Sequence, residues 1–132
     1  MIKLFLNIPI LKRLIPSIGI KVLKLLNKNK GFYKVNNILF YFDFLDPIDR
    51  KIILYNEYEH DSVSFLEDKF VQHSISNFLD IGANSGYFSF YFANKFKNLK
   101  IKAYEPNLEA FEKFKKTLTK NFFKNIEIFN YG

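Results

Sequence analysis

The residues with the clearest chemical signature lie between Phe78 and Gly86, in the stretch FLDIGANSG. An apolar run ends in the carboxylate of Asp80, and Gly82 and Gly86 then bound a short loop. Glycine lets a backbone pass close to a ligand, and a helix that begins after such a loop directs its N–H groups toward the same place. We therefore interpret residues 80–86 as a cofactor-binding loop.

A second acidic residue, Glu105, follows Gly86 by 19 residues. That spacing fits one helix and one strand, so it predicts that Glu105 lies beside the loop, at the sheet edge where open α/β folds bind ligands. A carboxylate there can accept two hydrogen bonds from the hydroxyls of a ribose. The G-x-x-x-G spacing differs from the dinucleotide pattern, and the acid at Asp80 favours a ligand with an ammonium group over a pyrophosphate. A dinucleotide-dependent oxidoreductase is therefore the less favoured alternative.

Each acidic residue has a second interpretation when it is considered alone. Asp80 is equally compatible with a cap for the following helix, and Glu105 with a solvated strand end. Their combination with two glycines at this spacing favours the cofactor site. His60 and His73, the two histidines, show no metal-ligand spacing, so we interpret both as surface or structural residues and predict no metal site.

Residues 77–132 resemble S-adenosylmethionine-dependent methyltransferases of the FkbM type. The stretch DIGANSG is similar to motif I of these enzymes, and AYEPN is similar to their next acidic strand end. The upstream stretch YEHDSVSFLEDKF, within residues 43–76, resembles the family more weakly, and residues 1–42 hardly at all. The resemblance implies S-adenosylmethionine as cofactor and O-methylation of a sugar or small-metabolite hydroxyl.

The resemblance also implies which residues contact the cofactor, although it identifies no catalytic residue in this chain. Asp80 would hold the loop or the cofactor's amino group, and Glu105 would hold the ribose hydroxyls. Pro106 and Asn107 would border the adenine. The residues implied to line the methionine and ribose portion of the cofactor are Gly82, Ala83, Asn84 and Gly86. Three others are implied to lie near the cofactor in less central positions: Ser85, Tyr87 and Glu59.

The order of elements around these residues predicts an α/β fold with a doubly wound parallel sheet of the Rossmann-like methyltransferase type. Strands are expected at residues 78–81, 99–104 and 126–129, with helices over 87–96 and after Asn107. The apolar first strand is predicted to be buried on both faces. Further strands of such a sheet do not follow, so we expect an incomplete domain whose first strand keeps an open edge.

The helix after Asn107 shows an apolar stripe with charged residues on the other side. Its core-facing residues are predicted to be Leu108, Phe111, Phe114 and Leu118. Two i,i+4 pairs are expected in solvent on the outer face, Glu109–Lys113 and Glu112–Lys116. We expect the lysine-rich faces of all the helices to be solvated.

Upstream of the loop, the sequence predicts a hairpin and two helices. Two short strands over residues 32–42 surround Asn36-Asn37, which suits a tight turn. Asp46-Pro47 signals a helix over about residues 48–54. The next helix is predicted to begin with Asp61 or Ser62 as its cap, to end near Gln72 and to bury Val63, Leu66 and Phe70. We divide the chain into residues 1–42, a basic segment with a helix and the hairpin, and residues 43–132, the N-terminal half of a methyltransferase domain, which we expect to be incomplete.

Composition and charge limit the size of the fold, the kinds of metal site and the partners that the chain can have. The 132 residues are 48% hydrophobic, enough for the core of one domain, and the absence of cysteine excludes disulfides and thiolate metal sites. The net charge of +7 comes from residues 1–42, which hold eight basic residues and no acid, whereas residues 43–132 hold 12 basic and 13 acidic ones. The catalytic part is therefore close to neutral, which argues against binding of a nucleic-acid backbone.

The first 30 residues predict a short amphipathic helix after Pro16, with Ile18, Val22 and Leu25 on one side and lysines on the other. One interpretation is a helix packed on the domain, and the other is a contact with an anionic membrane surface, in which the chain would act as an interaction module. Charged residues and prolines interrupt the segment, so it predicts neither a transmembrane span nor a secretory signal. We expect a cytoplasmic protein, peripheral at the membrane under the second interpretation, and the sequence predicts no oligomeric state.

Overall fold

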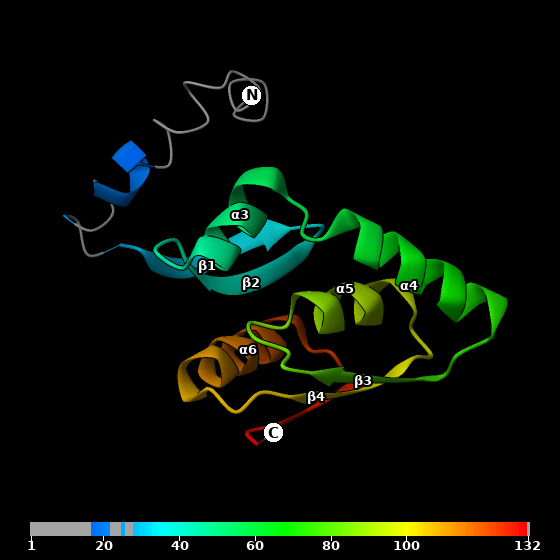
Figure 1. Ribbon diagram of the computed structural model, residues 1–132. Helices are drawn as coiled ribbons and strands as arrows, with labels where there is room; N and C mark the ends of the chain where they lie inside the picture. The colour runs from blue at the N-terminus through cyan, green and yellow to red at the C-terminus, as the bar shows by residue number, and fades with distance from the viewer. Residues whose placement is uncertain (1–16, 22–24, 26–27, 132) are drawn as a thin grey trace.

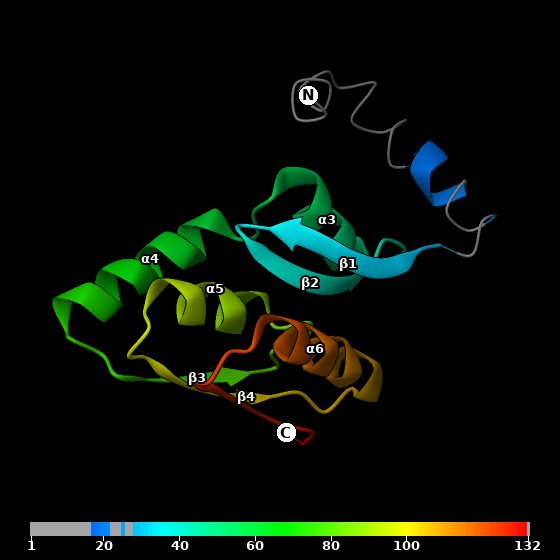
Figure 2. The ribbon, with the colours of Figure 1, turned by 180° about the vertical axis from the view of Figure 1, so that it is seen from behind.

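The computed structural model describes residues 17–21, 25 and 28–131. Figure 1 shows three layers: a parallel sheet, a layer of helices on one of its faces, and a hairpin with a short helix beyond those helices. Figure 2 shows the same layers from behind. The hairpin and the parallel sheet thus lie on opposite sides of the helices, which are enclosed between them.

The parallel sheet has the strand order β3-β4-β5, formed by β3 (Asn77–Ile81), β4 (Lys100–Tyr104) and β5 (Ile126–Phe129). Helices α5 (Tyr87–Lys95) and α6 (Leu108–Asn121) connect successive strands. Both strand pairs are parallel. The predicted α/β class and the alternation of strand and helix are therefore confirmed.

The hairpin consists of β1 (Lys30–Val35) and β2 (Ile38–Asp43). Asn36 and Asn37 form its turn with φ angles of 49° and 66°, a left-handed conformation that asparagine tolerates well. The predicted hairpin is confirmed, and its second strand, β2, lies along α6. There the backbone N–H of Tyr41 donates to Thr117 Oγ1 at 2.9 Å, so side chains of α6 satisfy the strand edge.

Two further helices connect the hairpin to the sheet, α3 (Pro47–Tyr55) and α4 (His60–Gln72). Asp46 caps α3 by accepting hydrogen bonds from the N–H groups of Ile48 and Asp49, as the Asp-Pro signal predicts. The predicted cap of α4 was wrong. This helix begins at His60, and Glu59 precedes it in a left-handed conformation without a side-chain cap. The ring of Tyr58, just before this start, contacts that of Tyr87 on α5.

Helix α5 carries aromatic residues around its circumference and is buried on both sides. Phe90 contacts Phe114 of α6 and Phe40 of the hairpin. Phe92, on the other side, contacts Phe70 of α4 and Phe78 of β3. The helix is therefore the centre of one continuous core that includes the hairpin.

Strand β3 is covered on one face only, which contradicts the predicted burial on both faces. Leu79 and Ile81 have 60% and 77% of their surface exposed. All three helices α4, α5 and α6 pack on the opposite face of the sheet (Figure 1). Within the described part of the chain, β3 pairs with β4 alone.

The predicted outer face of α6 was also wrong in part. Leu108 is exposed instead of buried, whereas Lys113 is buried. Lys113 pairs with Asp46 and Asp49 of the α3 region, and Glu109 binds Lys30 in place of Lys113. Because the hairpin and α3 add a second packing surface to α6, a face expected in solvent lies in the interior.

The amphipathic helix predicted near the N-terminus falls mostly outside the described residues. Residues 17–21 and 25 are helical, and the side chains of Ile18 and Leu25 are exposed. Over the described ranges, no helix is long and apolar enough to cross a membrane.

Candidate cofactor site

The loop after β3 is held against the end of β4. The backbone N–H groups of Gly82 and Ala83 both donate to the carbonyl oxygen of Tyr104, at 2.9 and 3.0 Å. Gly82, Asn84 and Gly86 adopt left-handed conformations with φ angles of 77°, 51° and 89°. This alternation turns the chain tightly from β3 into the first turn of α5.

The two loop glycines are required for different reasons. A Cβ atom on Gly86 would lie 2.6 Å from ring atoms of both Phe90 and Phe114, so this glycine permits close packing of the loop on the core. A Cβ atom on Gly82 would meet no other atom within 4 Å. Gly82 therefore faces open space, where a ligand can approach the backbone closely.

Glu105 links the loop to the second strand end. Its side chain is largely buried, with 6% of the residue exposed. One carboxylate oxygen accepts from the N–H of Asn84 at 2.7 Å, and the other accepts from the N–H of Asn107 at 2.8 Å. Each carboxylate oxygen has a further lone pair, so Glu105 can hold both backbone segments and still accept from ligand hydroxyls.

A cavity of about 410 Å³ opens beside this carboxylate, a volume typical of small-molecule sites. Its lining combines predicted site residues with neighbours from α3 and α6: Asp46, Gly82, Asn84, Glu105, Asn107, Glu109, Ala110 and Lys113. Three of these side chains are carboxylates and one is an ammonium group. The cavity therefore favours a ligand with positive charge and hydroxyl groups.

A buried ionic network lies next to the cavity and fixes the loop from behind. Lys113 Nζ lies 2.6 Å from Asp49 Oδ2 and 3.2 Å from Asp46 Oδ2. The hydroxyl of Ser85 donates to Asp49 Oδ1 at 2.9 Å. Burial alone would lower the pKa of Lys113, but its hydrogen bonds and charge interactions with the two carboxylates outweigh burial and raise the pKa. Lys113 is therefore charged.

Asp80 lies beneath the loop and binds the first turn of α5. Its Oδ2 atom accepts from the Ser89 hydroxyl at 2.6 Å. Burial raises the pKa of Asp80, hydrogen bonds from the hydroxyl and backbone of Ser89 oppose this effect, and the nearby charge of Glu105 adds to it. Asp80 thus orients the start of the helix and does not line the cavity.

The other predicted site residues have separate locations. Ser85 is buried with its hydroxyl on Asp49, and Ala83 is buried within the loop. The carbonyl of Pro106 accepts from the side chain of Asn130 at 3.2 Å. Glu59 is exposed and outside the cavity, and Tyr87 lines a different one.

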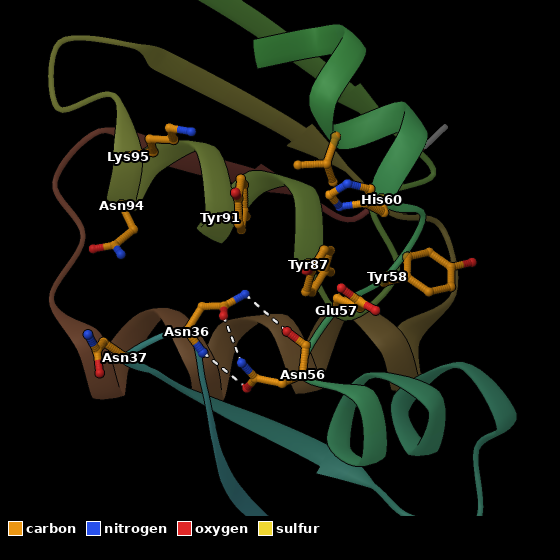
Figure 3. Close-up of a pocket in the computed structure, with 11 residues that line it drawn as sticks. Asn36, Asn37, Asn56, Glu57, Tyr58, His60, Tyr87, Tyr91, Asn94 and Lys95 are labelled. Carbon is orange, nitrogen blue, oxygen red and sulfur yellow. Dashed lines mark hydrogen bonds between the residues drawn. The ribbon is translucent and has the colours of Figure 1, made fainter. Parts of the chain in front are cut away.

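This second cavity, of about 640 Å³, lies between the hairpin turn, the α3–α4 connection and α5 (Figure 3). The side chains of Asn36 and Asn56 contact each other in its wall, where Asn56 Nδ2 donates to Asn36 Oδ1 at 2.8 Å. Tyr87 and Tyr91 of α5 point into it, with Glu57 nearby (Figure 3). Its wall is formed mainly by amide, hydroxyl and charged groups, and none of the loop glycines lines it.

Sequence reasoning missed three residues of the candidate site, Asp46, Glu109 and Lys113. Asp46 was recognised only as part of a helix-start signal, although it also lines the cavity. Lys113 was assigned to solvent because its i−4 neighbour is Glu109. Asp46 and Asp49 lie three residues apart with no basic residue between them, which was a signal that a distant cation pairs with them.

Comparisons with known proteins identify the fold. No family model matches the chain, and a search of curated proteins found no match. Among solved structures, M. jannaschii TYW2 in complex with AdoMet superposes with a TM-score of 0.54 and 17% identity over 78% of this chain and 43% of that one. A Staphylococcus aureus protein provisionally identified as a caffeoyl-CoA O-methyltransferase superposes with a TM-score of 0.53 and 17% identity, over 88% of this chain and 50% of that one.

A Pyrococcus horikoshii protein provisionally identified as a transferase also superposes, with a TM-score of 0.53 and 13% identity over 94% of this chain and 50% of that one. The chain thus spans half or less of the length of these solved proteins. At these identities the likeness shows the fold, which is the Rossmann-like fold of methyltransferases.

Proposed function

We propose that this chain provides the cofactor-binding part of an S-adenosylmethionine-dependent methyltransferase. The observation that supports this proposal most directly is the position of Glu105. Its carboxylate accepts hydrogen bonds from the backbone N–H groups of Asn84 and Asn107 at the edge of an acidic cavity. A ribose presents two adjacent hydroxyls that a carboxylate can accept together, and a sulfonium with an amino group brings positive charge. When bound, the cofactor would supply an activated methyl group.

The open space beside the loop supports the proposal in addition to the charge of the cavity. Gly82 has open space where a side chain would lie, so its backbone is accessible to a ligand. In this proposal Glu105 holds the ribose hydroxyls, Asn107 lies beside the adenine, and Asp80 acts indirectly by orienting α5 through Ser89. The charge of Lys113 is neutralised by Asp46 and Asp49, so it does not oppose a cationic ligand.

The finer parts of the proposal rest on the resemblance of DIGANSG and AYEPN to FkbM-type enzymes. They are membership of that family and a sugar or small-metabolite hydroxyl as methyl acceptor. Transfer to a hydroxyl requires alignment of the oxygen with the methyl group and exclusion of water, with a general base where the oxygen needs one. No residue of the candidate site is assigned that role.

The test is calorimetric titration of the full chain with S-adenosylhomocysteine. Replacement Glu105→Gln is expected to weaken binding about tenfold or more, because charge-assisted hydrogen bonds to the ribose are lost. Gly82→Val is expected to abolish binding, because its side chain enters the cavity. Glu127→Gln, at an exposed position on β5, is the matched control and should bind as the unaltered chain does.

Thermal unfolding of each variant separates loss of binding from loss of folding. Binding that is the same in Glu105→Gln, Gly82→Val and the control would disprove the site. Stabilisation by NAD but not by S-adenosylhomocysteine would instead favour a dinucleotide-dependent oxidoreductase.

A further inference from the structure

A groove of about 620 Å³ runs between the outer face of the hairpin and the C-terminal half of α6. We call it the aromatic–lysine groove after six of its residues: Phe32, Tyr41, Lys115, Lys116, Lys120 and Phe122. It shares no lining residue with the cofactor cavity. Its function therefore does not depend on the function proposed above.

Phe122 has a backbone conformation that is unfavourable for phenylalanine, and burial of its side chain does not compensate for this cost. It follows the last residue of α6 with a φ angle of 57°, a left-handed conformation that costs a residue other than glycine about 1–2 kcal/mol. Glycine or asparagine is the usual choice at such a helix end. Yet 84% of Phe122 is exposed, so packing does not explain its presence. The fold presents a large apolar ring to the exterior at a strained position.

Lysines line the same groove as this ring and cover the faces of two other aromatic side chains. Lys116 Nζ lies 4.2 Å from the ring centroid of Tyr41, and Lys120 Nζ lies 5.6 Å from that of Phe32. The groove includes one carboxylate, Glu112, which Lys115 binds at 3.4 Å. The groove therefore combines exposed apolar surface with a net positive rim.

We propose that the aromatic–lysine groove binds the surface of an anionic lipid bilayer. Phe122 would insert at the boundary between headgroups and acyl chains, while Lys116 and Lys120 contact the phosphates. The charge of the chain is complementary to such a surface, since residues 1–42, which include β1, contain eight basic residues and no acid. Single-stranded RNA fits less well, because base stacking needs free ring faces and lysines cover those of Phe32 and Tyr41.

Sedimentation of the full chain with vesicles tests the charge contribution. Phosphatidylcholine vesicles are compared with vesicles of equal parts phosphatidylcholine and phosphatidylglycerol, and binding is expected only to the second. The variant Lys116→Gln/Lys120→Gln should bind the anionic vesicles roughly 25-fold more weakly, since each lysine near such a surface contributes about fivefold. Circular dichroism checks that the variant is folded.

The variant Phe122→Asn separates a lipid contact from a structural role. Asparagine tolerates the left-handed conformation better than phenylalanine, so the variant should unfold at an equal or higher temperature. It should nevertheless bind anionic vesicles about tenfold more weakly, because the inserting ring is gone. Unchanged vesicle binding by Phe122→Asn would overturn the proposal.

The matched control is Phe65→Gln/Lys69→Gln on α4, where an exposed phenylalanine also lies beneath a lysine, with Lys69 Nζ at 5.4 Å from the ring centroid. This variant should bind vesicles as the unaltered chain does. If this control lost as much vesicle binding as the groove variants, binding would follow the total charge of the chain, and the assignment to the groove would be overturned. Binding of oligouridylate that depends on Lys116 and Lys120, without vesicle binding, would replace the bilayer by RNA.

Discussion

The ammonium group of Lys113 lies 2.6 Å from the carboxylate of Asp49, and both side chains are almost fully removed from solvent. This pair joins α6 to α3, and the hydroxyl of Ser85 brings the loop to the same carboxylate. Three segments that are far apart in the sequence therefore meet at Asp49, next to the candidate cofactor cavity. The pair holds the loop in position as well as stabilising the fold.

Removal of the Lys113 charge should strongly destabilise the protein. The variant Lys113→Met leaves Asp49 buried without a counterion and is expected to lower the free energy of unfolding by about 3–5 kcal/mol, measured by urea denaturation. Lys115→Met, which removes an exposed ion pair with Glu112, should cost less than about 1 kcal/mol. Equal losses in the free energy of unfolding of the two variants would show that the buried ion pair stabilises the fold no more than the exposed one.

The two loop glycines should differ in their tolerance of alanine. Gly86→Ala combines a left-handed φ angle with contacts of 2.6 Å to Phe90 and Phe114, so it is expected to cost about 2–5 kcal/mol. Gly82→Ala has the unfavourable φ angle alone and should cost about 1–2 kcal/mol. Denaturant unfolding of both variants measures the difference, and the reverse order would contradict the described packing of the loop.

The contact between β2 and α6 should depend on Thr117. Its hydroxyl accepts from the N–H of Tyr41 at 2.9 Å, so Thr117→Val leaves that group unpaired at a cost of about 1–3 kcal/mol. Hydrogen exchange of the Tyr41 amide should become faster. Thr119→Val is the control, because the Thr119 hydroxyl is exposed and donates only to the carbonyl of Lys115 within its own helix. Unaltered exchange at Tyr41 in Thr117→Val would disprove the contact.

Alkaline stability should depend on Tyr91. Burial and the hydrogen bond to Glu67 raise the pKa of Tyr91 from 10.0 to about 12. The unfolded chain therefore releases this proton at a lower pH than the folded chain, and the stability contributed by the neutral phenol, present below about pH 10, is lost as the pH rises toward about 12. Tyr91→Phe should make the free energy of unfolding fall less steeply above pH 10, as measured by urea denaturation at several pH values.

Absorbance titration of tyrosine ionisation provides the control for that prediction. In Glu67→Gln the phenol of Tyr91 loses its negatively charged neighbour, so its pKa should decrease while the residue itself is retained. A late-titrating tyrosine that remains in Tyr91→Phe would show that another residue is responsible.

The local features of the fold could be predicted because each depends on neighbours in the sequence. The turn at Asn36 and Asn37, the cap at Asp46 and the glycine loop after β3 all follow from the conformations that these residue types favour. The alternation of strands and helices from residue 77 onward is likewise a matter of short-range pattern. The approach of Glu105 to the loop was predictable because connections in a parallel α/β sheet bring successive strand ends to one edge.

The remaining features depend on which surfaces meet, and a periodic pattern does not contain that information. An amphipathic pattern shows that α6 has an apolar side, but the docking of the hairpin and α3 decides that Lys113 is buried among carboxylates. The same pattern places Leu79 and Ile81 in an apolar strand, whereas the location of all the helices on one face leaves them exposed.

The sequence by itself therefore determined the element types, the loop and the acidic partner of that loop, since these follow from backbone preference and strand order. Only the tertiary structure decided how the candidate site is supported, with Ser85 and Asp80 turned inward and Asp46, Glu109 and Lys113 added to the cavity. The physical reason is that burial and ion pairing are properties of contacts between distant segments. Those contacts exist only once the hairpin, the helices and the sheet have packed together.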